Sequence, residues 1–298
     1  MIELTQKEYE KYRKKGQKTN EGYVFLNPKN KKKIIKVIES RPNSPKYLGN
    51  KIYTIGSLIR NYDYLHELNI AMPEEGVIIE NEPRGYSAQV IKGEELLFYL
   101  SNTDVPIDMK ISSLKQVGKL LRDMALIRKK YPHLSDFYYN DIHERNFIVT
   151  NQGILYGIDV DSCRIQGNIP VQGLYSLSLI EQTTPEISKY SRIQTKSPEE
   201  SAIIPDENLD IYCYIRMIVN FISGKQLLNL TPKMLNDYLN YLASKGANLE
   251  LLYAISSIYN DSKDNINPDY LLDYIKEMYS YSNIRYDQTG EVARILRR

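Results

Sequence analysis

The first third of the chain alternates between apolar and polar positions, as strands half-buried in a sheet do. The segment GQKTNEGYVFLNPKNKKKIIKVI (16–38) reads as a loop followed by two strands with an Asn-Pro turn between them. Two further strands are predicted at 76–80 and 85–91, joined by a tight turn. The pattern predicts a small, β-rich unit at the start of the chain.

Helical spacing replaces this alternation elsewhere. The stretch 51–68 has apolar residues on one face. Gly56 lies inside it and is unfavourable in a helix interior, so the helix is expected to begin at Lys51 or only at Ser57. A long helix is predicted at 111–130, with a serine near its start as the cap. Further helices are predicted at 6–15, 210–224, 232–244, 249–259 and 268–280.

Composition favours a globular chain with enough residues for two lobes. Of the 298 residues, 42% are hydrophobic and 26% charged, and 39 basic residues nearly balance 37 acidic ones. A net charge of +2 argues against a nucleic-acid or anionic-membrane partner. The basic segments 11–18 and 29–36 are interpreted as solvated surface. Cys163 and Cys213 do not suggest a disulfide framework.

The amino-terminal residues are charged and lack the apolar core of a signal peptide. The longest apolar stretch, 211–222, contains Arg216 and is too short to cross a bilayer. We therefore expect a soluble, cytoplasmic protein without a membrane partner.

The segment from Tyr131 to Ser162 contains the candidate catalytic and metal-binding residues. Asp141 and Asn146 lie five positions apart in a polar loop, and Asp159 follows thirteen residues later at the end of an apolar, strand-like run. Magnesium prefers hard oxygen ligands and keeps substrate phosphates among them. With Asn146 and Asp159 on the metal, Asp141 would orient or deprotonate an attacking hydroxyl, which predicts phosphoryl transfer.

A lysine in the first unit lies where burial is expected. Lys36 interrupts the apolar run IIKVI, where an ammonium is costly to bury without an anionic partner. The alternative is an edge strand that points this lysine to solvent. Gly16 and Gly22 could flank a loop that covers a phosphate, because glycine lets backbone N–H groups approach closely. A plain hairpin entry is the alternative for both glycines.

The segments DIHERN and IDVDS resemble the catalytic loop and the metal-binding aspartate segment of the protein kinase-like fold. The Asp-x-His form is similar to that of aminoglycoside and choline kinases and of atypical bacterial or phage-type protein kinases. The resemblance implies an α+β, bilobal fold that binds ATP and Mg²⁺. Asp141, His143 and Asn146 would be catalytic, Asn146 and Asp159 would hold the metal, and Lys36 would contact the nucleotide phosphates.

A second match lies further on. The segment 210–224 resembles a buried helix of this family whose first residue, here Asp210, accepts hydrogen bonds from the catalytic-loop backbone. Ser197-Pro198-Glu199 stands where the family has Ala-Pro-Glu, after a long loop that resembles an activation segment.

The resemblance implies four parts: a β-rich N-lobe at 1–92, a hinge at 93–97, a mainly helical C-lobe at 98–285 and a tail at 286–298. The hinge backbone, including Glu94, would face the adenine.

Three departures from the family bear on activity. The three-glycine form of the family's phosphate-covering loop is missing around Gly16 and Gly22. The glutamate that normally pairs the lysine is missing, since its expected position falls on Asn61, with Asp63 and Glu67 nearby. Either Asp63 substitutes, or Lys36 is held another way, or the site is impaired. Asp161 stands where the family commonly has glycine.

The prediction is an ATP- and Mg²⁺-dependent kinase, with a protein Ser/Thr hydroxyl favoured as acceptor. The alternatives are a small-molecule kinase resembling aminoglycoside phosphotransferases, and a pseudokinase that binds nucleotide or serves as a scaffold.

Overall fold

The structure is a computed structural model that describes residues 1–39, 46–168, 193–194, 202–203, 205–223 and 232–244, with isolated positions between 247 and 256. The chain divides into two compact units. Unit 1 comprises Met1–Gly93, Asp123–Tyr139 and Tyr156–Val171, and unit 2 comprises Glu94–Arg122, Asn140–Leu155 and Gln172–Arg298.

A six-stranded sheet forms the centre of unit 1, with the strand order β1-β5-β6-β4-β3-β2. Neighbouring strands are antiparallel except β1 and β5, which are parallel. The four strands expected from the alternation are present, and β1 and β2 join them at the two edges. The strands are β1 (Ile2–Leu4), β2 (Gln17–Lys18), β3 (Gly22–Leu26), β4 (Lys33–Ile38), β5 (Glu75–Ile79) and β6 (Glu82–Gln89).

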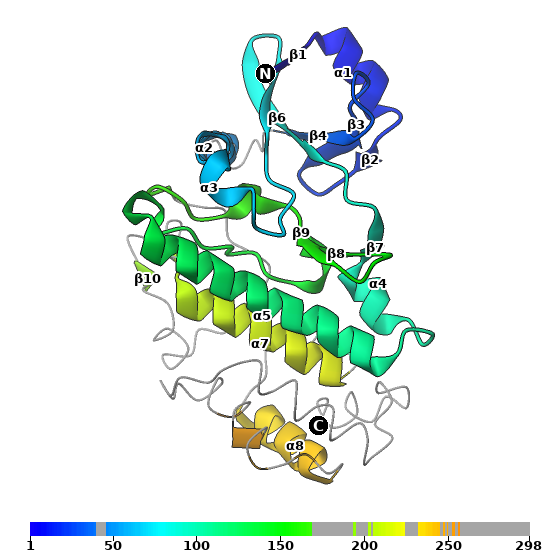
Figure 1. Cartoon of the computed structure of the whole chain (residues 1–298), viewed down its shortest axis with the longest axis vertical. Coiled ribbons are helices and arrows are strands. Elements are labelled where there is room, and N and C mark those ends of the chain that lie inside the picture. The colour runs from blue at the N-terminus through cyan, green and yellow to red at the C-terminus, as the bar shows by residue number, and fades with distance from the viewer. Residues whose placement is uncertain are drawn as a thin grey trace. The chain divides into compact units, whose positions relative to one another are not determined.

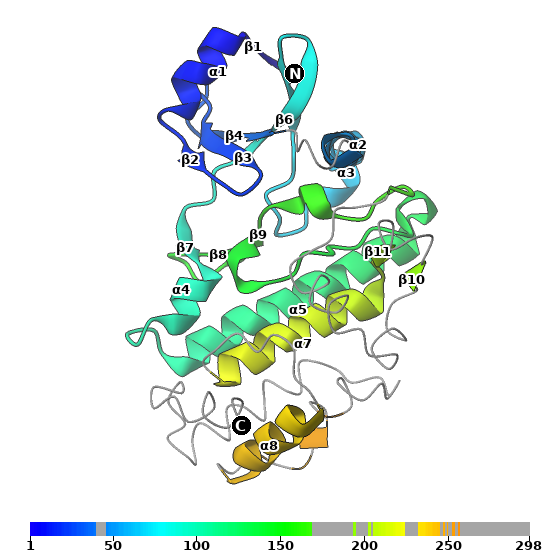
Figure 2. The ribbon, with the colours of Figure 1, turned by 180° about the vertical axis from the view of Figure 1, so that it is seen from behind.

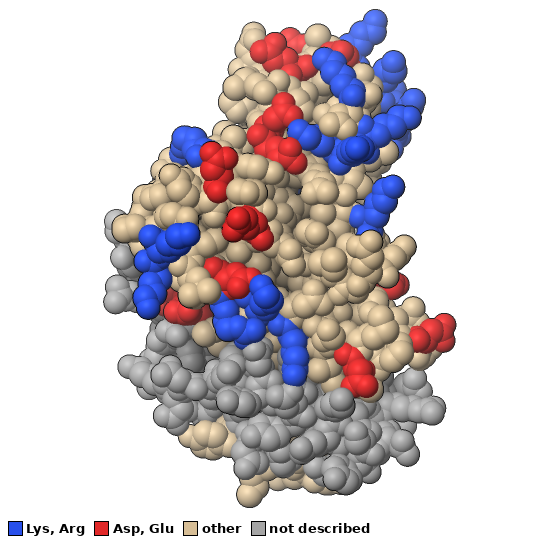
Figure 3. Space-filling model, viewed as in Figure 1, with Lys and Arg blue, Asp and Glu red and all other residues tan. Residues whose placement is uncertain are grey.

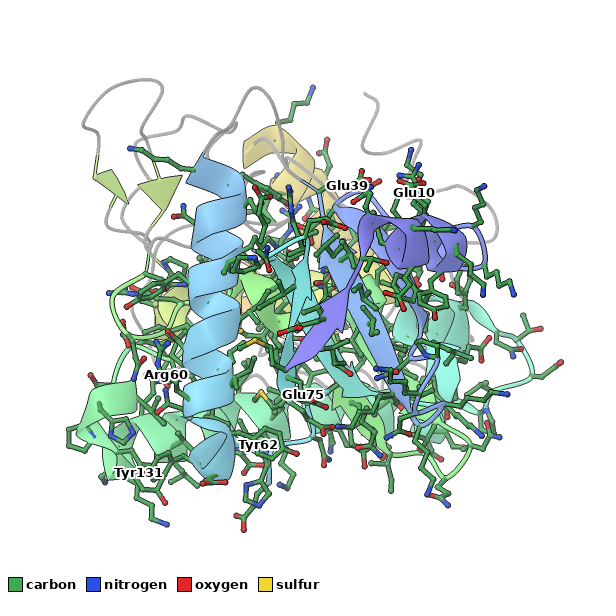
Figure 4. All side chains as sticks on the ribbon, turned by 90° about the horizontal axis from the view of Figure 1, so that it is seen from above. Glu10, Glu39, Arg60, Tyr62, Glu75 and Tyr131 are labelled. Atoms are coloured by element: carbon green, nitrogen blue, oxygen red, sulfur yellow. The ribbon has the colours of Figure 1, made fainter. Side chains whose placement is uncertain are left out.

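Each face of this sheet is covered by one helix. Successive residues of β4 point to opposite faces. Ile35 belongs to a core cluster that contains Tyr9 of α1 (Gln6–Arg13). Ile38 belongs to another that contains Tyr47 of α2 (Lys46–Arg60). Figure 4 shows α1, which carries Glu10, and α2, which ends at Arg60, on opposite sides of the strands.

β4 lies between β6 and β3 and is therefore an inner strand. Lys36 shares its side of β4 with Ile38, so its side chain extends toward α2. The edge-strand alternative for Lys36 does not hold.

The helix predicted at 51–68 is in fact two helices, α2 and the short α3 (Tyr62–Leu65). α2 begins at Lys46 and contains Gly56, so both expected starts, Lys51 and Ser57, were wrong. Packing of the inner face against the sheet compensates for the low helix propensity of glycine.

Unit 2 is mainly helical. Figures 1 and 2 both show α5 and α7 side by side, and the Tyr214 hydroxyl of α7 donates to the Leu114 carbonyl of α5 at 2.9 Å. β7 and β8 form a small sheet with β9, in the order β7-β8-β9. The remaining elements of the chain are β7 (Gly93–Glu95), α4 (Leu96–Ser101), α5 (Ile107–Lys130), β8 (Phe147–Thr150), β9 (Leu155–Gly157), β10 (Ile193–Gln194), β11 (Ala202–Ile203), α7 (Glu207–Ser223) and α8 (Pro232–Ser244). The α+β class, β-rich first and helical afterwards, is confirmed.

Several helix limits differ from the sequence-based ones. α8 spans the predicted residues, whereas α5 begins one turn earlier than expected, at Ile107. The expected serine cap was therefore wrong, because the Ser113 hydroxyl donates within α5 to the Met109 carbonyl at 3.0 Å. Ser197-Pro198-Glu199, most of 249–259, all of 268–280 and the tail at 286–298 lie outside the described residues.

The basic segments lie largely on the surface, as expected. Figure 3 shows Lys and Arg side chains gathered over the part of unit 1 that contains α1 and its neighbouring strands. Lys11, Lys14 and Lys29 are exposed, whereas Lys36 is buried. In the described part of the chain, no helix combines the length and the apolar character needed to cross a membrane.

Candidate active site

Lys36 lies in a buried cluster of charged side chains in unit 1. It is only 4% exposed. Its Nζ is 2.9 Å from Glu21 Oε2 and 2.7 Å from Asp161 Oδ2, and it also contacts the carboxylate of Asp159. The structure therefore brings the predicted phosphate-binding lysine into contact with the predicted metal-binding aspartate.

A second lysine enters this cluster from α2. Lys51 is 1% exposed, and its Nζ lies 2.8 Å from Glu21 Oε1. It also donates to the Ser162 hydroxyl at 2.6 Å and contacts the carboxylate of Asp161. α2 thus carries a cation on the face where the family resemblance implies an acid.

The candidates named for the missing glutamate do not fill that role. Asn61 is buried, but its amide donates to the Ser57 carbonyl at 2.8 Å. Asp63 and Glu67 are exposed. Of the three alternatives for the missing glutamate, the structure therefore supports the second. Lys36 is held in another way, by Glu21 and by two aspartates.

Glu21 comes from the turn between β2 and β3. Its Oε1 accepts a 2.6 Å hydrogen bond from the Tyr47 hydroxyl, in addition to its contacts with the two lysines. The turn is closed by a hydrogen bond from the Thr19 N–H to the Gly22 carbonyl, at 2.8 Å. The carboxylate therefore reaches inward from a short surface turn.

The lysines and Glu21 in this cluster favour one another's charged forms, whereas burial raises the pKa of Asp159 to about 6. Burial acts to lower the pKa of Lys36, but Asp159 and Asp161 outweigh it and hold that pKa well above its ordinary value. The pKa of Lys51 is raised in the same way, chiefly by Asp161 against the effect of burial. Burial acts to raise the pKa of Glu21, yet the two lysines bring it well below its usual range. At neutral pH all three side chains are charged.

Gly22 follows this turn as the first residue of β3, and Gly16 lies directly before β2. A Cβ on Gly22 would lie 2.0 Å from the Val37 carbonyl oxygen, and a Cβ on Gly16 would lie 2.7 Å from the Val24 carbonyl oxygen. Both glycines therefore allow close packing of strands, which fits the plain hairpin alternative, and a role in covering a phosphate stays a prediction.

Asp159 follows β9 in a left-handed backbone conformation, with φ of 61°. Asp tolerates this region better than most residues. The hydroxyl of Tyr139, which is 1% exposed, donates to the Ile158 carbonyl at 2.6 Å. The Tyr139 ring also packs against Gly157, where a Cβ would lie 2.9 Å from its hydroxyl oxygen. Tyr139 thus fixes the backbone just before Asp159.

The catalytic-loop candidates lie in unit 2. The Asn146 amide nitrogen donates to the Asp141 carbonyl at 2.8 Å and to Asp141 Oδ2 at 3.0 Å. Because an amide's oxygen and nitrogen point apart, this pairing turns the Asn146 oxygen, the atom able to bind a metal, away from Asp141.

His143 lies between Asp141 and Asn146 in the sequence. Its Nδ1 accepts a hydrogen bond from the Arg145 N–H at 3.2 Å, which places the proton of a neutral ring on Nε2. That Nε2 is 3.6 Å from Asp141 Oδ1. His143 therefore presents a donor on the side of the candidate catalytic carboxylate.

α7 holds this loop near both ends. Asp210 accepts a 2.7 Å hydrogen bond from the backbone N–H of Asn140, as the family resemblance implies. Asn220 donates to Glu144 Oε1 at 3.1 Å. Asn140 has φ of 68°, so the first of these bonds holds a backbone conformation that is uncommon for residues other than glycine.

Glu94 lies in β7 and is exposed, and the predicted hinge contains this strand and the start of α4. Its backbone contact with an adenine stays a prediction.

Two residues of this cluster, Lys51 and Glu21, were not identified from the sequence, and only Lys51 had a signal that could have revealed it. Lys51 lies four positions after Tyr47 and four before Ile55, both of which are buried, so helical spacing alone puts this lysine on the inner face. Glu21 lies in a polar turn, and nothing local distinguishes it from surface glutamates.

The carboxylates of Glu21, Asp159 and Asp161 lie within 4.8 Å of one another. Hard oxygen donors of this kind suit Mg²⁺, so the residues present fit the ion that the resemblance implies. Lys36 and Lys51 contact these same carboxylate groups, and a metal ion would therefore compete with the two lysines.

No protein-family model matches the chain, and no curated protein matches it. Among solved structures, 1242 chains match. One of them is described as the ROP18 kinase domain in complex with AMP-PNP and sucrose. It is 14% identical, with 95% of this chain and 81% of that chain covered and a TM-score of 0.49.

Proposed function

We propose that the chain transfers the γ-phosphoryl group of ATP to an alcohol in a Mg²⁺-dependent reaction. The observation that carries this proposal is the contact between Lys36 and Asp159, which lie 123 positions apart in the sequence. An ammonium can bind phosphate oxygens, and a carboxylate can bind Mg²⁺. Their contact joins the two chemical groups that a nucleotide phosphate site needs.

The remaining roles follow from the loop in unit 2. Asp141 takes the proton of the acceptor hydroxyl while the acceptor oxygen bonds to the γ-phosphorus. The bond from that phosphorus to the β–γ bridging oxygen breaks, and ADP leaves with the electron pair. His143 donates to the transferred group through Nε2. Asn146, tied to Asp141, fixes the direction of that carboxylate.

Asp159 and Asn146 are the proposed metal ligands. When bound, Mg²⁺ would supply positive charge against the negative charge that develops on the phosphates. Lys36 positions the phosphates, and the backbone at Glu94 contacts the adenine.

A protein Ser/Thr hydroxyl is the proposed acceptor. Only residues 102–106 connect α4 to α5, so no additional helices stand between the hinge and the long helix. Inserted helices at this point are common in small-molecule kinases of the fold that the sequence resembles. The Asp-x-His form favours the small-molecule alternative, and an acceptor panel must therefore include both classes.

Thermal shift and intact mass together test the proposal. ATP with Mg²⁺ should raise the melting temperature, since a ligand at a hundred times its dissociation constant stabilises the native state by about 2.7 kcal/mol. Asp159→Asn should remove the Mg²⁺-dependent part, whereas Asp63→Asn, at an exposed position, should not. A protein that shows no shift with any nucleotide at millimolar concentration would rule out the nucleotide site.

A pseudokinase is the second candidate, and one observation favours it. Asp161 stands where the family commonly has glycine, and its carboxylate contacts both lysines. This cluster could hold nucleotide without turnover. Phosphate transfer by wild type that is no faster than by Asp141→Asn, across protein and small-molecule acceptors, would favour the pseudokinase.

A further inference from the structure

One carboxylate bridges two buried lysines in unit 1. Glu21 Oε2 lies 2.9 Å from Lys36 Nζ, and Glu21 Oε1 lies 2.8 Å from Lys51 Nζ. The Tyr47 hydroxyl donates to the same Oε1 at 2.6 Å. Two ammonium groups and a hydroxyl thus converge on a pair of anionic oxygens, an arrangement that also suits two oxygens of a phosphate.

Charge balance does not require Glu21. Lys36 and Lys51 supply two positive charges, and Asp159 and Asp161, which contact them, supply two negative charges. With Glu21 included the cluster carries a net charge of −1, which disfavours a polyphosphate. Without Glu21 the cluster is neutral, and a bound cation would make it positive.

Glu21 is also the member of the bridge that can move most easily. Its side chain is 18% exposed, against 5% for Lys36 and 1% for Lys51. Its backbone carbonyl accepts a 2.8 Å hydrogen bond from the Glu39 N–H, so the turn itself is anchored while the side chain can rotate outward. The lysines are fixed in β4 and α2.

We infer that Lys36 and Lys51 form a two-lysine binding site for a polyphosphate, and that the Glu21 carboxylate fills this site until the ligand displaces it. The inference rests on the proposed function only in taking that polyphosphate to be the triphosphate of ATP. Lys51 is then a phosphate-binding residue supplied by α2. Glu21 is an internal competitor and not a fixed partner that positions Lys36.

The test is calorimetric titration of the full chain with Mg²⁺–ATP and, separately, with inorganic tripolyphosphate. Glu21→Gln removes the competing charge and should tighten both by about tenfold, the equivalent of 1.4 kcal/mol. Lys51→Met should weaken both by a similar factor. Glu3→Gln and Lys29→Met, at exposed positions of the same unit, should change neither.

Lys51→Met leaves Asp161 with one cation fewer and could fail to fold. The pair Lys51→Met with Asp161→Asn, compared with Asp161→Asn alone, then reports the contribution of Lys51. Glu21→Gln gives an independent answer. If Glu21 is a fixed partner of Lys36, this substitution should weaken polyphosphate binding. If Glu21 is a competitor, the substitution should strengthen it.

The inference would be overturned if Glu21→Gln bound both ligands more weakly than wild type, or if loss of Lys51 left binding unchanged. Either result would count against it even if wild type transfers phosphate. The predicted changes in tripolyphosphate binding, found together with no phosphoryl transfer by any form, would support the inference and count against the proposed enzyme. An absence of binding by wild type and by Glu21→Gln would overturn both.

Discussion

The carboxylate of Asp210 accepts a 2.7 Å hydrogen bond from the backbone N–H of Asn140, seventy positions earlier in the chain. Asp210 is 3% exposed and Asn140 is fully buried. The bond therefore satisfies a buried donor whose own backbone is held at positive φ, and it links α7 to the start of the candidate catalytic loop.

Asp210→Ala should lower the free energy of unfolding by about 1 to 3 kcal/mol, because the Asn140 N–H would be left buried without its acceptor. Denaturant unfolding measures this change. Asp210→Asn keeps an acceptor oxygen and serves as the matched control, with a smaller expected loss. A melting temperature and activity unchanged in Asp210→Ala would contradict the role of Asp210 as a brace.

Asp141→Asn should lower phosphoryl transfer by about a hundred- to ten-thousand-fold, the usual contribution of a general base, while the ATP thermal shift persists. Lys36→Met should instead weaken the thermal shift itself. The two variants separate the acceptor side from the nucleotide side. Loss of nucleotide binding in Asp141→Asn would show that this carboxylate does not act on the acceptor alone.

Lys51→Met should destabilise the chain by about 3 to 5 kcal/mol, since it removes one partner of a buried ion pair with Asp161. Adding Asp161→Asn should recover part of that loss, because the uncompensated charge is then gone. A double-mutant cycle of unfolding free energies gives the coupling. Additive losses in the two single variants would mean that the pair does not interact.

Tyr9 should make stability fall at alkaline pH. Burial, and then Glu39, raise the pKa of Tyr9 from 10.0 to about 12. Between these values the unfolded chain releases the phenol proton while the folded chain keeps it. The stabilisation is therefore complete below pH 10 and is lost as the pH rises toward about 12.

The free energy of unfolding should therefore fall less in Tyr9→Phe than in wild type when the pH rises from 9 to 11. The expected difference between the two losses is roughly 1 to 2 kcal/mol. Tyr64→Phe, at an exposed tyrosine, is the control. Parallel losses in wild type and Tyr9→Phe would mean that other groups account for the alkaline decline.

Short-range patterns predicted much of the fold. The alternation around Lys36 identified a buried strand with a lysine inside it, and the run after Asp210 identified a buried helix whose aspartate meets the loop backbone. Both signals are local, because the period of two or 3.6 residues is set by backbone geometry.

The partners of Lys36 could not be predicted in the same way. Glu21 lies 15 positions before it in a surface turn, and Asp161 joins it from far along the chain. β1 was missed because three residues, Ile2–Leu4, are too few to display a period, and it pairs in parallel with the distant β5. Such contacts depend on how separate elements pack, which periodicity does not encode.

Gly85 of β6 takes part in no chemistry, yet a Cβ added there would lie 1.9 Å from the carbonyl oxygen of Lys36. Even an alanine at this position would push β4 away from β6 and carry the lysine with it. Loss of function by mutation is therefore not confined to the charged residues. Among natural variants of this chain, a substitution at Gly85 would therefore indicate a protein that has lost its function, even where every lysine and carboxylate of the cluster is retained.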